Sequence, residues 1–316
     1  IVKTKFEMEM PNEEDFIDQK INNLKELEYD REKLKVYFLD GLSTDQTPKK
    51  IREAAQNIPN WHFIETNCKG KINQLNYGLN HFSEGADIIV NTDVDAILSK
   101  NILNCFIREF ETDSRIALVG ANISPGSSIA LDKEHWQDQN ITRILESNVF
   151  TSSIVVAPCY AFKPYLLDQF PSDCVADDVY IAFKANTEKH LTKYIPEGEG
   201  KEIRSPISLG DFFAHKFRKG NAFLLELLRF FYRLPQMTMG WKLIYLTKFL
   251  QLAVMPWVLP YFFLTTISLI LSGPNISQIA LLSIFILLAS FLATSALMIR
   301  EREKLGGKRK TLWSIR

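Results

Sequence analysis

The central sequence pattern is Asp87-Ile88-Ile89-Val90-Asn91-Thr92-Asp93-Val94-Asp95. Its branched apolar residues predict a buried strand, and two carboxylates follow where open α/β sheets bind their ligands. In an extended segment the side chains of residues i and i+2 point to the same side, so we expect Asp93 and Asp95 to share one hard divalent cation. The same pattern also fits a solvated junction between a strand and a turn, and the motif alone leaves both interpretations open.

Strands and helices alternate along the chain on both sides of this pattern. We expect strands at 2–10, 34–39, 61–65, 116–121 and 154–162, and helices at 16–27, 49–57, 71–82, 101–111, 141–150 and 179–189. Residues 122–140 resemble a loop, and residues 194–208 an irregular segment. The alternation predicts an α/β fold with a mixed, mainly parallel sheet and helices on both faces.

The C-terminal part has the composition of a membrane anchor. Residues 249–299 contain no charged residue. Two apolar segments, 249–272 and 276–299, are each long enough at ~1.5 Å per residue to cross a ~30 Å hydrocarbon core. Soluble helices keep a polar face, which these segments lack. We therefore predict two transmembrane helices.

Basic residues flank this anchor on both sides. Residues 216–248 carry seven basic residues and one acidic residue, and residues 300–316 carry seven and two. Since basic residues concentrate on the cytoplasmic side of membrane spans, both clusters and the domain at 1–215 are expected there. We expect 216–248 to form a basic interfacial helical segment and 300–316 a basic cytosolic tail. For 223–234, a helix on the lipid surface and an amphipathic helix packed on the domain both remain open.

The four cysteines show no CxxC spacing. This pattern fits a reducing compartment and argues against a zinc cluster.

Taken in order, the motifs resemble the family 2 glycosyltransferases, specifically their membrane-anchored bacterial members with a GT-A catalytic domain. The resemblance covers about residues 2–228. Its marks are Asn12-Glu13-Glu14, Asp40 with Ser43-Thr44-Asp45, Gly70-Lys71 with Leu75-Asn76, Asp93-Val94-Asp95, Tyr160-Ala161-Phe162, Asp177-Asp178, and Arg218 with Gly220. The resemblance implies that residues 1–215 form a GT-A-type catalytic domain.

The resemblance also implies how a nucleotide-diphosphate sugar would be held. Mg²⁺ or Mn²⁺ would bind at Asp93 and Asp95, with Asp95 the more direct ligand, and would stabilise the diphosphate as it leaves. Asp40 would hold the base or ribose of the nucleotide. Lys71 and Arg218 would supply positive charge to the diphosphate. A solvated lysine and a membrane-surface arginine are the alternative interpretations of these two residues.

The acid pair Asp177-Asp178 would supply the general base. The resemblance implies direct displacement with inversion at the sugar carbon, with Asp178 taking the proton of the acceptor hydroxyl. Asp177 replaces the more usual Glu and is expected to raise the proton affinity of its neighbour, so the assignment between the two stays open.

Three departures from the family pattern stand out. Gly41 replaces the second Asp of the first loop and is expected to loosen nucleotide contacts. Ala157, followed by a proline, replaces the usual Gly before the aromatic strand, which affects the acceptor pocket. The Gln-x-x-Arg-Trp motif of processive synthases appears as residues 215–219, with Lys219 in place of the Trp.

The leading hypothesis is an inverting, metal-dependent hexosyltransferase of the bacterial inner membrane, multi-pass and with a cytosolic catalytic domain. It would act on a lipid-linked or membrane-presented acceptor during synthesis of a surface glycolipid or polysaccharide. A polyprenyl-phosphate glycosyltransferase and a catalytically silent nucleotide-sugar-binding subunit of a larger synthase are the alternatives. A partner membrane subunit would supply further helices if the product is a polymer, and no nucleic acid is expected among the partners.

Overall fold

The computed structural model describes residues 4–10, 13–272, 277–279 and 281–286. It divides into two compact units, Ile1–Leu246 and Thr247–Arg316, and each is considered by itself.

The first unit is built on a mixed sheet of eight strands among the described residues. In spatial order the strands are β3 (Trp61–Glu65), β2 (Leu34–Asp40), β1 (Thr4–Met10), β4 (Ile88–Thr92), β7 (Cys159–Phe162), β6 (Ile116–Pro125), β8 (Leu191–Glu202) and β5 (Ala96–Leu98). The first four are parallel, β7 is antiparallel to both β4 and β6, and β8 is parallel to β6. The predicted mixed, mainly parallel sheet is confirmed.

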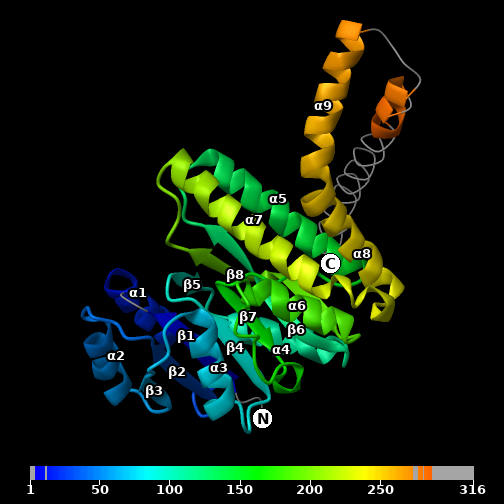
Figure 1. Cartoon of the computed structure of the whole chain (residues 1–316). Coiled ribbons are helices and arrows are strands. Elements are labelled where there is room, and N and C mark those ends of the chain that lie inside the picture. The colour runs from blue at the N-terminus through cyan, green and yellow to red at the C-terminus, as the bar shows by residue number, and fades with distance from the viewer. Residues whose placement is uncertain (1–3, 11–12, 273–276, 280, 287–316) are drawn as a thin grey trace, which may run out of the picture. The chain divides into compact units, whose positions relative to one another are not determined.

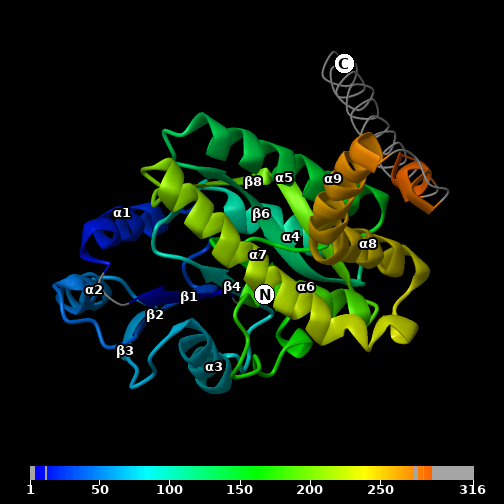
Figure 2. The same cartoon turned by 45° about the horizontal axis from the view of Figure 1, so that its top comes forward.

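Helices cover both faces of this sheet (Figure 1). The helices that pack on the sheet are α1 (Glu14–Lys25), α2 (Thr47–Gln56), α3 (Lys71–Phe82), α4 (Ile102–Thr112), α5 (Ala130–Val149) and α6 (Asp177–Thr187). Two further helices, α7 (Leu209–Phe231) and α8 (Met239–Phe249), pack on α6. Figure 2 shows α1, α4 and α5 on one side of the sheet and α3 and α6 on the other.

The central strand β4 explains why two layers of helices are needed. Its residues Ile88 and Val90 belong to the apolar cluster that includes α1 and α4, and Ile89 belongs to the cluster that includes α3 and α6. All three side chains are at most 1% exposed. Because successive strand residues point to opposite faces, a strand that is apolar throughout must be covered on both.

Helix α5 corrects one prediction. The loop expected over 122–140 is wrong at both ends, because strand β6 continues to Pro125 and α5 begins at Ala130 rather than at Ile141. Its inward-facing residues are Asp132, Trp136, Arg143 and Ser147. Mostly polar residues on the buried side conceal the apolar periodicity by which a helix is recognised.

Strand β8 corrects a second prediction, the irregular segment expected over 194–208. Prolines and glycines are rare in strands, and this segment contains Pro196 and Gly200. In the pairing with β6, Ile195 lies opposite Ala121 and Glu199 lies opposite the next residue, Asn122. Residues 196–198 therefore have no partner on β6 and form a bulge. A Cβ atom at Gly200 would lie 2.6 Å from Ile123 Cδ1, so the glycine permits close packing of the two strands.

Two smaller strands also differ from expectation. The strand expected over 154–162 is confined to Cys159–Phe162, because Pro158 has no backbone N–H to donate to a ladder. Strand β5 was not predicted, since three residues are too few to show a period.

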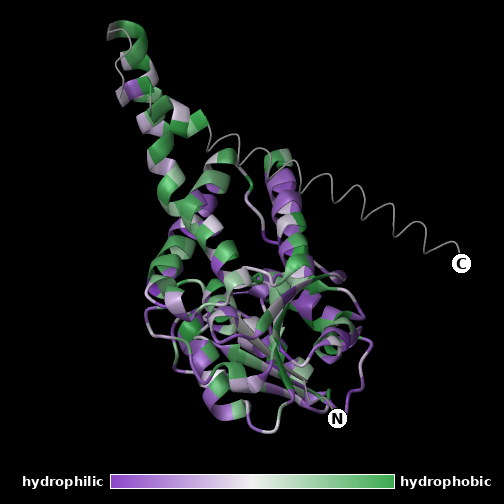
Figure 3. Ribbon diagram, turned by 90° about the vertical axis from the view of Figure 1, so that its right-hand side faces the viewer, coloured by the Kyte–Doolittle hydropathy of each residue, from purple (hydrophilic) through white to green (hydrophobic). Residues whose placement is uncertain are grey.

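The second unit begins within the last turn of α8 and continues with a π-helical segment, Leu250–Val254, and α9 (Met255–Ser272). Among the described residues one helix, Met239–Leu271, is long and apolar enough to cross a membrane. Figure 3 shows that hydrophobic residues predominate along α9.

A shorter apolar helix, Ser277–Ile286, contacts α9. The Phe262 and Phe285 rings stack with centroids 3.7 Å apart, and Gln278 donates a hydrogen bond to Ser268 over 2.9 Å. The second predicted span, 276–299, lies partly outside the described residues, and the predicted tail, 300–316, lies wholly outside them.

The contact of α6 with α7 and α8 leads to a test of stability. Phe183 of α6 is fully buried and makes edge contacts with Phe230 and Trp241 at centroid distances of 5.7 and 5.3 Å. Phe183→Ala should lower the stability of the first unit by roughly 3–5 kcal/mol, because it leaves a cavity between three helices. Thermal unfolding of the detergent-solubilised chain would show this as a lower Tm. The matched control is Phe217→Ala on α7, whose side chain is 73% exposed and whose loss should leave the Tm unchanged.

Candidate active site

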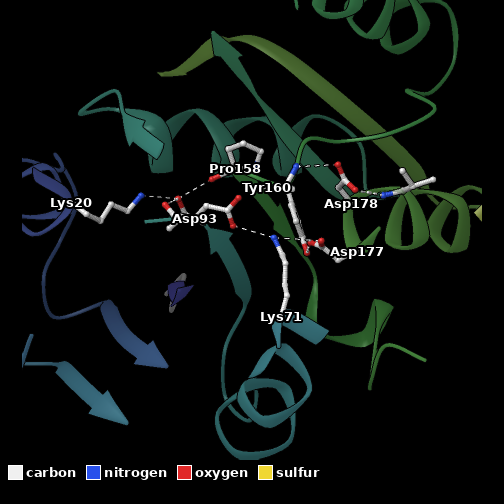
Figure 4. A network of polar contacts seen from close by, with 10 residues as sticks. Lys20, Lys71, Asp93, Pro158, Tyr160, Asp177 and Asp178 are labelled. Carbon is white, nitrogen blue, oxygen red and sulfur yellow. Dashed lines mark hydrogen bonds and ion pairs between the residues drawn. The ribbon is translucent and has the colours of Figure 1, made fainter. Parts of the chain in front are cut away.

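The predicted acids gather at the C-terminal end of the parallel part of the sheet. Asp40 ends β2, Asp93 follows β4, and Asp177 and Asp178 begin α6. Lys71, the first residue of α3, points between Asp93 and Asp177 (Figure 4). This is the edge at which open α/β sheets bind ligands.

The Asp93-Val94-Asp95 segment is a turn rather than the extended segment that the sequence predicts. The Ala96 N–H donates to Asp93 O over 3.3 Å, and the Asp93 N–H donates to Pro158 O over 3.1 Å. Within the turn the Val94 side chain is packed in the core, 2% exposed. Both carboxylates remain accessible, with 26% of the Asp93 side chain and 13% of the Asp95 side chain exposed.

Lys71 links two of the acidic groups. Its ammonium lies 3.1 Å from Asp93 Oδ1 and 3.4 Å from Asp177 Oδ1. The helix α3 begins directly after Gly70, whose φ of 89° is the left-handed conformation that favours glycine. The Lys71 ammonium therefore joins the turn after β4 to the start of α6.

Arg204, which follows β8, is a second cation in the site. Its guanidinium forms an ion pair with Glu13 and lies 3.5 Å from Asp95 Oδ2. It also lies over the Phe16 ring, 4.9 Å from the ring centroid. Burial raises the pKa of Asp95, and the negative charge of Asp93 raises it further, while Arg204 opposes both effects.

Asp177 and Asp178 have different surroundings although they are adjacent. Asp177 is 3% exposed and accepts a hydrogen bond from the Tyr160 hydroxyl over 2.8 Å. Asp178 accepts from the backbone N–H groups of Ala157 and Val179 over 3.2 and 3.0 Å. The side chain of Asp177 is thus held by Lys71 and Tyr160, whereas Asp178 accepts hydrogen bonds from backbone groups.

The Asp178 carboxyl has the proton affinity that a general base needs. Burial and the negative charge of Asp177 raise its pKa to about 6, against the opposing charges of Lys219 and Lys71. A carboxylate with a pKa slightly below neutrality is ionised at pH 7 and still accepts a proton effectively.

Asp40 lies where β2 passes into a loop, and one of its carboxylate oxygens accepts no hydrogen bond from the described residues. Its side chain is 4% exposed, and Oδ2 accepts from the Ser43 N–H over 3.2 Å. Within the described part of the chain, Oδ1 has no hydrogen-bond partner. A buried carboxylate oxygen without a partner is costly, so it is suited to accept from a ligand N–H or O–H group.

Gly41 has a steric role in this loop. A Cβ atom at this position would lie 1.8 Å from Gln74 Nε2. The glycine therefore allows Gln74 of α3, which is 1% exposed, to pack beneath the loop.

The structure does not bring Arg218 into contact with the acids. Arg218 is exposed on α7 and has no ion pair with another described residue. It is Lys219, the next residue, whose positive charge acts on Asp178. Burial raises the pKa of Glu202, the last residue of β8, to about 7, and Lys219 opposes this shift.

Sequence reasoning missed several residues of this site. It assigned no role to Lys20, Arg204 or Glu202, and it took Glu13 and Tyr160 only as parts of family marks. Lys20 had a detectable signal, because it lies among Ile17, Ile21 and Leu24 on the apolar side of α1. Arg204 had none, because its partners are 109 and 191 positions away in the chain.

The donor atoms of the site fit a hard divalent cation shared with a ligand. No group of three or more His, Cys, Asp or Glu side chains suited to a metal occurs among the described residues. Asp93 and Asp95 supply carboxylate oxygens from one turn, and the repulsion between these two acids favours a positive charge beside them. Mg²⁺ and Mn²⁺ accept such oxygens and complete their shells with water and phosphate oxygens.

Comparison with known families and proteins gives one family match. Residues 10–170, about half of the chain, match the family model described as glycosyl transferase family 2. No curated protein sequence matches the chain.

Solved structures resemble the chain over most of its length. The mannosyltransferase PcManGT from Pyrobaculum calidifontis, in complex with GDP-Man and Mn²⁺, is 23% identical with a TM-score of 0.71, over 99% of this chain and 88% of that one. TarS 1-349 from S. aureus is 14% identical with a TM-score of 0.56, over 88% of this chain and 77% of that one. Its complex with UDP-GlcNAc has the same identity and TM-score, over 82% and 76%. These likenesses confirm the GT-A-like α/β fold.

The two acids at the start of α6 can be tested by titration. In the parental chain the Asp178 carboxyl should lose its proton near pH 6. Asp177→Asn removes a neighbouring negative charge and should therefore lower the pKa of Asp178. Infrared difference spectra would follow the carboxylate band that disappears in Asp178→Asn. The control is Asp173→Asn, an exposed acid paired with Arg229, which should leave the titration unchanged.

Proposed function

The chain belongs to glycosyl transferase family 2, and from this membership we propose that it is an inverting, metal-dependent enzyme acting on a membrane-presented acceptor. The donor would be a nucleotide-diphosphate sugar. One observation carries the proposal: Lys71 contacts both Asp93 of the cation-holding turn and Asp177 beside the general base. A leaving group bound at the turn would thus lie next to an acceptor hydroxyl bound at α6.

Asp178 would perform the proton transfer. Its carboxylate takes the proton of the acceptor hydroxyl while that oxygen bonds to the anomeric carbon, and the bond from this carbon to the diphosphate oxygen breaks on the opposite face. The sugar carbon is therefore inverted. Because the base must be ionised, the rate should rise with pH through the Asp178 pKa of about 6.

The remaining residues would bind and orient the donor. The unpartnered Oδ1 of Asp40 accepts from the base or ribose of the nucleotide. Lys71 and Arg204 supply charge to the diphosphate, and Asp93 and Asp95 hold the cation. When bound, Mg²⁺ or Mn²⁺ would neutralise the charge that develops on the leaving diphosphate.

The solved relatives support the choice of donor and cofactor. The mannosyltransferase was solved with GDP-Man and Mn²⁺, and TarS with UDP-GlcNAc. A nucleotide-diphosphate sugar and a divalent cation are therefore the first ligands to test.

A membrane-presented acceptor is supported by the outward side of α7. Five apolar residues of this helix are more than half exposed: Leu209, Phe213, Phe217, Leu225 and Leu228. They have basic neighbours in Arg218 and Lys219. A helix with apolar residues on its exposed side and cationic neighbours is suited to the headgroup region of a bilayer. We therefore propose that the interfacial segment expected at 216–248 extends back to Leu209, and that the acceptor is lipid-linked.

The orientation proposed for the bacterial inner membrane places both basic clusters in the cytosol. The span 249–272 is supported by the apolar helix Met239–Leu271, and a second span by the contact between Phe262 and Phe285. A multi-pass anchor of this kind would keep the catalytic domain beside its lipid-linked acceptor.

The proposed reaction is tested with a panel of nucleotide sugars, Mg²⁺ or Mn²⁺, and the membrane-embedded protein. Asp178→Asn should reduce transfer by about a hundredfold or more and leave nucleotide binding intact, because only the proton transfer is lost. Asp95→Ala should instead weaken both metal dependence and nucleotide binding. Transfer at the parental rate by Asp178→Asn would exclude this residue as the base.

Product size, read by mass spectrometry, should be one or a few added sugars, since Lys219 has no flat apolar face on which a sugar can stack.

The topology is tested by cysteine labelling of intact cells. A membrane-impermeant thiol reagent should label Asn275→Cys, between the two proposed spans, but not Lys308→Cys in the basic tail. The parental chain is the background control, because three of its four cysteines are buried. Labelling of Lys308→Cys alone would reverse the orientation.

A further inference from the structure

A buried lysine lies behind the acidic turn. The Lys20 side chain on α1 is 0% exposed, and its Nζ donates to Thr92 Oγ1 over 2.8 Å and to Ala96 O over 2.6 Å. These two acceptors flank the Asp93-Val94-Asp95 turn, one on each side. Figure 4 shows Lys20 pointing from α1 toward the turn that carries Asp93.

A simple link between a helix and a strand would not need a charge. Asn23, one turn further along α1, provides such a link: its amide donates to Leu98 O over 2.7 Å and accepts from the Leu98 N–H over 2.9 Å. Burying an ammonium costs several kcal/mol unless nearby charges compensate it. The two hydrogen-bond acceptors of Lys20 are neutral groups. Burial lowers the pKa of Lys20 to about 8, and Cys159 and the carboxylates of Asp93 and Asp95 oppose this shift.

Lys20 also connects the turn to the loop before β7. The Thr92 hydroxyl that accepts from Lys20 donates in turn to Pro158 O over 3.0 Å, and the Asp93 N–H donates to the same oxygen. At the other end of the turn, the Ile203 N–H donates a hydrogen bond to Asp95 O over 2.7 Å. The Lys20 ammonium therefore joins the two ends of the turn on the side that faces α1. Backbone hydrogen bonds from the turn to Pro158 and Ile203 hold the turn on the side of the sheet.

We propose that Lys20 is a positioning residue that keeps the turn in the conformation in which Asp93 and Asp95 receive the divalent cation. This inference rests on the proposed metal role of the two acids. Lys20 is buried beneath the turn and acts through Thr92 and Ala96, so it does not touch the cation or the substrates.

Positioning and simple charge effects predict opposite results when Lys20 is neutralised. A positive charge near a cation site repels the cation, so its removal alone would tighten metal binding. Loss of the groups that orient metal ligands weakens metal binding instead. The direction of the change in Mn²⁺ affinity therefore separates the two effects.

The experiment measures Mn²⁺ binding to the full chain in detergent, from the electron paramagnetic resonance signal of free Mn²⁺. It is run with Mn²⁺ alone, with GDP and with UDP, below the melting temperature of every variant. Lys20→Met keeps the length of the side chain and should weaken Mn²⁺ binding by about tenfold, as loss of an outer-shell partner does. The matched control Asn23→Leu removes a link between the same helix and strand and should leave Mn²⁺ binding unchanged.

A second pair of variants keeps the charge of Lys20. Thr92→Val removes one of its two acceptors and should also weaken Mn²⁺ binding, whereas Thr92→Ser retains the hydroxyl and should bind as the parental chain does. This pair supplies the result if Lys20→Met does not fold.

Each outcome has a distinct meaning. If the parental chain binds Mn²⁺ and Lys20→Met binds it equally well or more tightly, the positioning role is overturned and the proposed function stands. Unchanged binding in Thr92→Val overturns it as well, and so does an equal loss in Asn23→Leu, which would reduce Lys20 to a general stabiliser of α1. A parental chain that binds no Mn²⁺ in any of the three series overturns the metal role and this inference with it.

Discussion

The crowding of carboxylates at one edge of the sheet is the constraint on which the site depends. Asp93 and Asp95 lie in the turn after β4 and Asp177 begins α6, and the repulsion among these acids in a partly buried place would be severe without cations. The chain places Lys71 between Asp93 and Asp177 and Arg204 beside Asp95. Each cation is carried by a different segment, so the charge balance exists only when α3, β8 and the turn after β4 have come together.

The same charge balance separates the roles of two adjacent acids. Asp177 faces Lys71 and Tyr160, whereas Asp178 accepts from backbone N–H groups. The fixed charge of Asp177 then raises the pKa of Asp178. Two identical side chains thus have the different surroundings that the proposed roles of an orienting group and a base require.

Helix α7 connects the charges of the site to an apolar surface. Its buried side packs on α6 through Phe230, and its Lys216 pairs with Asp132 of α5 at 3.1 Å. Lys219 on the same helix acts on Asp178 and Glu202, while Phe213 and Phe217 remain exposed. One helix therefore presents cations to the acids and apolar side chains to the outside, an arrangement that suits the proposed lipid-linked acceptor.

The sequence by itself determined the features that depend on local periodicity. The apolar strand at Ile88, the two acids that follow it and the alternation of strands and helices placed the sheet and its ligand-binding edge, because these patterns are visible within a few residues. Asp40, Asp177 and Asp178 were assigned to the site through the resemblance to the family. Only the tertiary structure decided which cations meet these acids. Arg204 rather than Arg218 contacts Asp95, and Lys20 lies behind the turn, because such contacts join segments about seventy to two hundred positions apart. The helix α5 and the strand β8 were hidden for a related reason: their inward sides carry polar or small residues whose partners lie on distant elements, so no local period marks them.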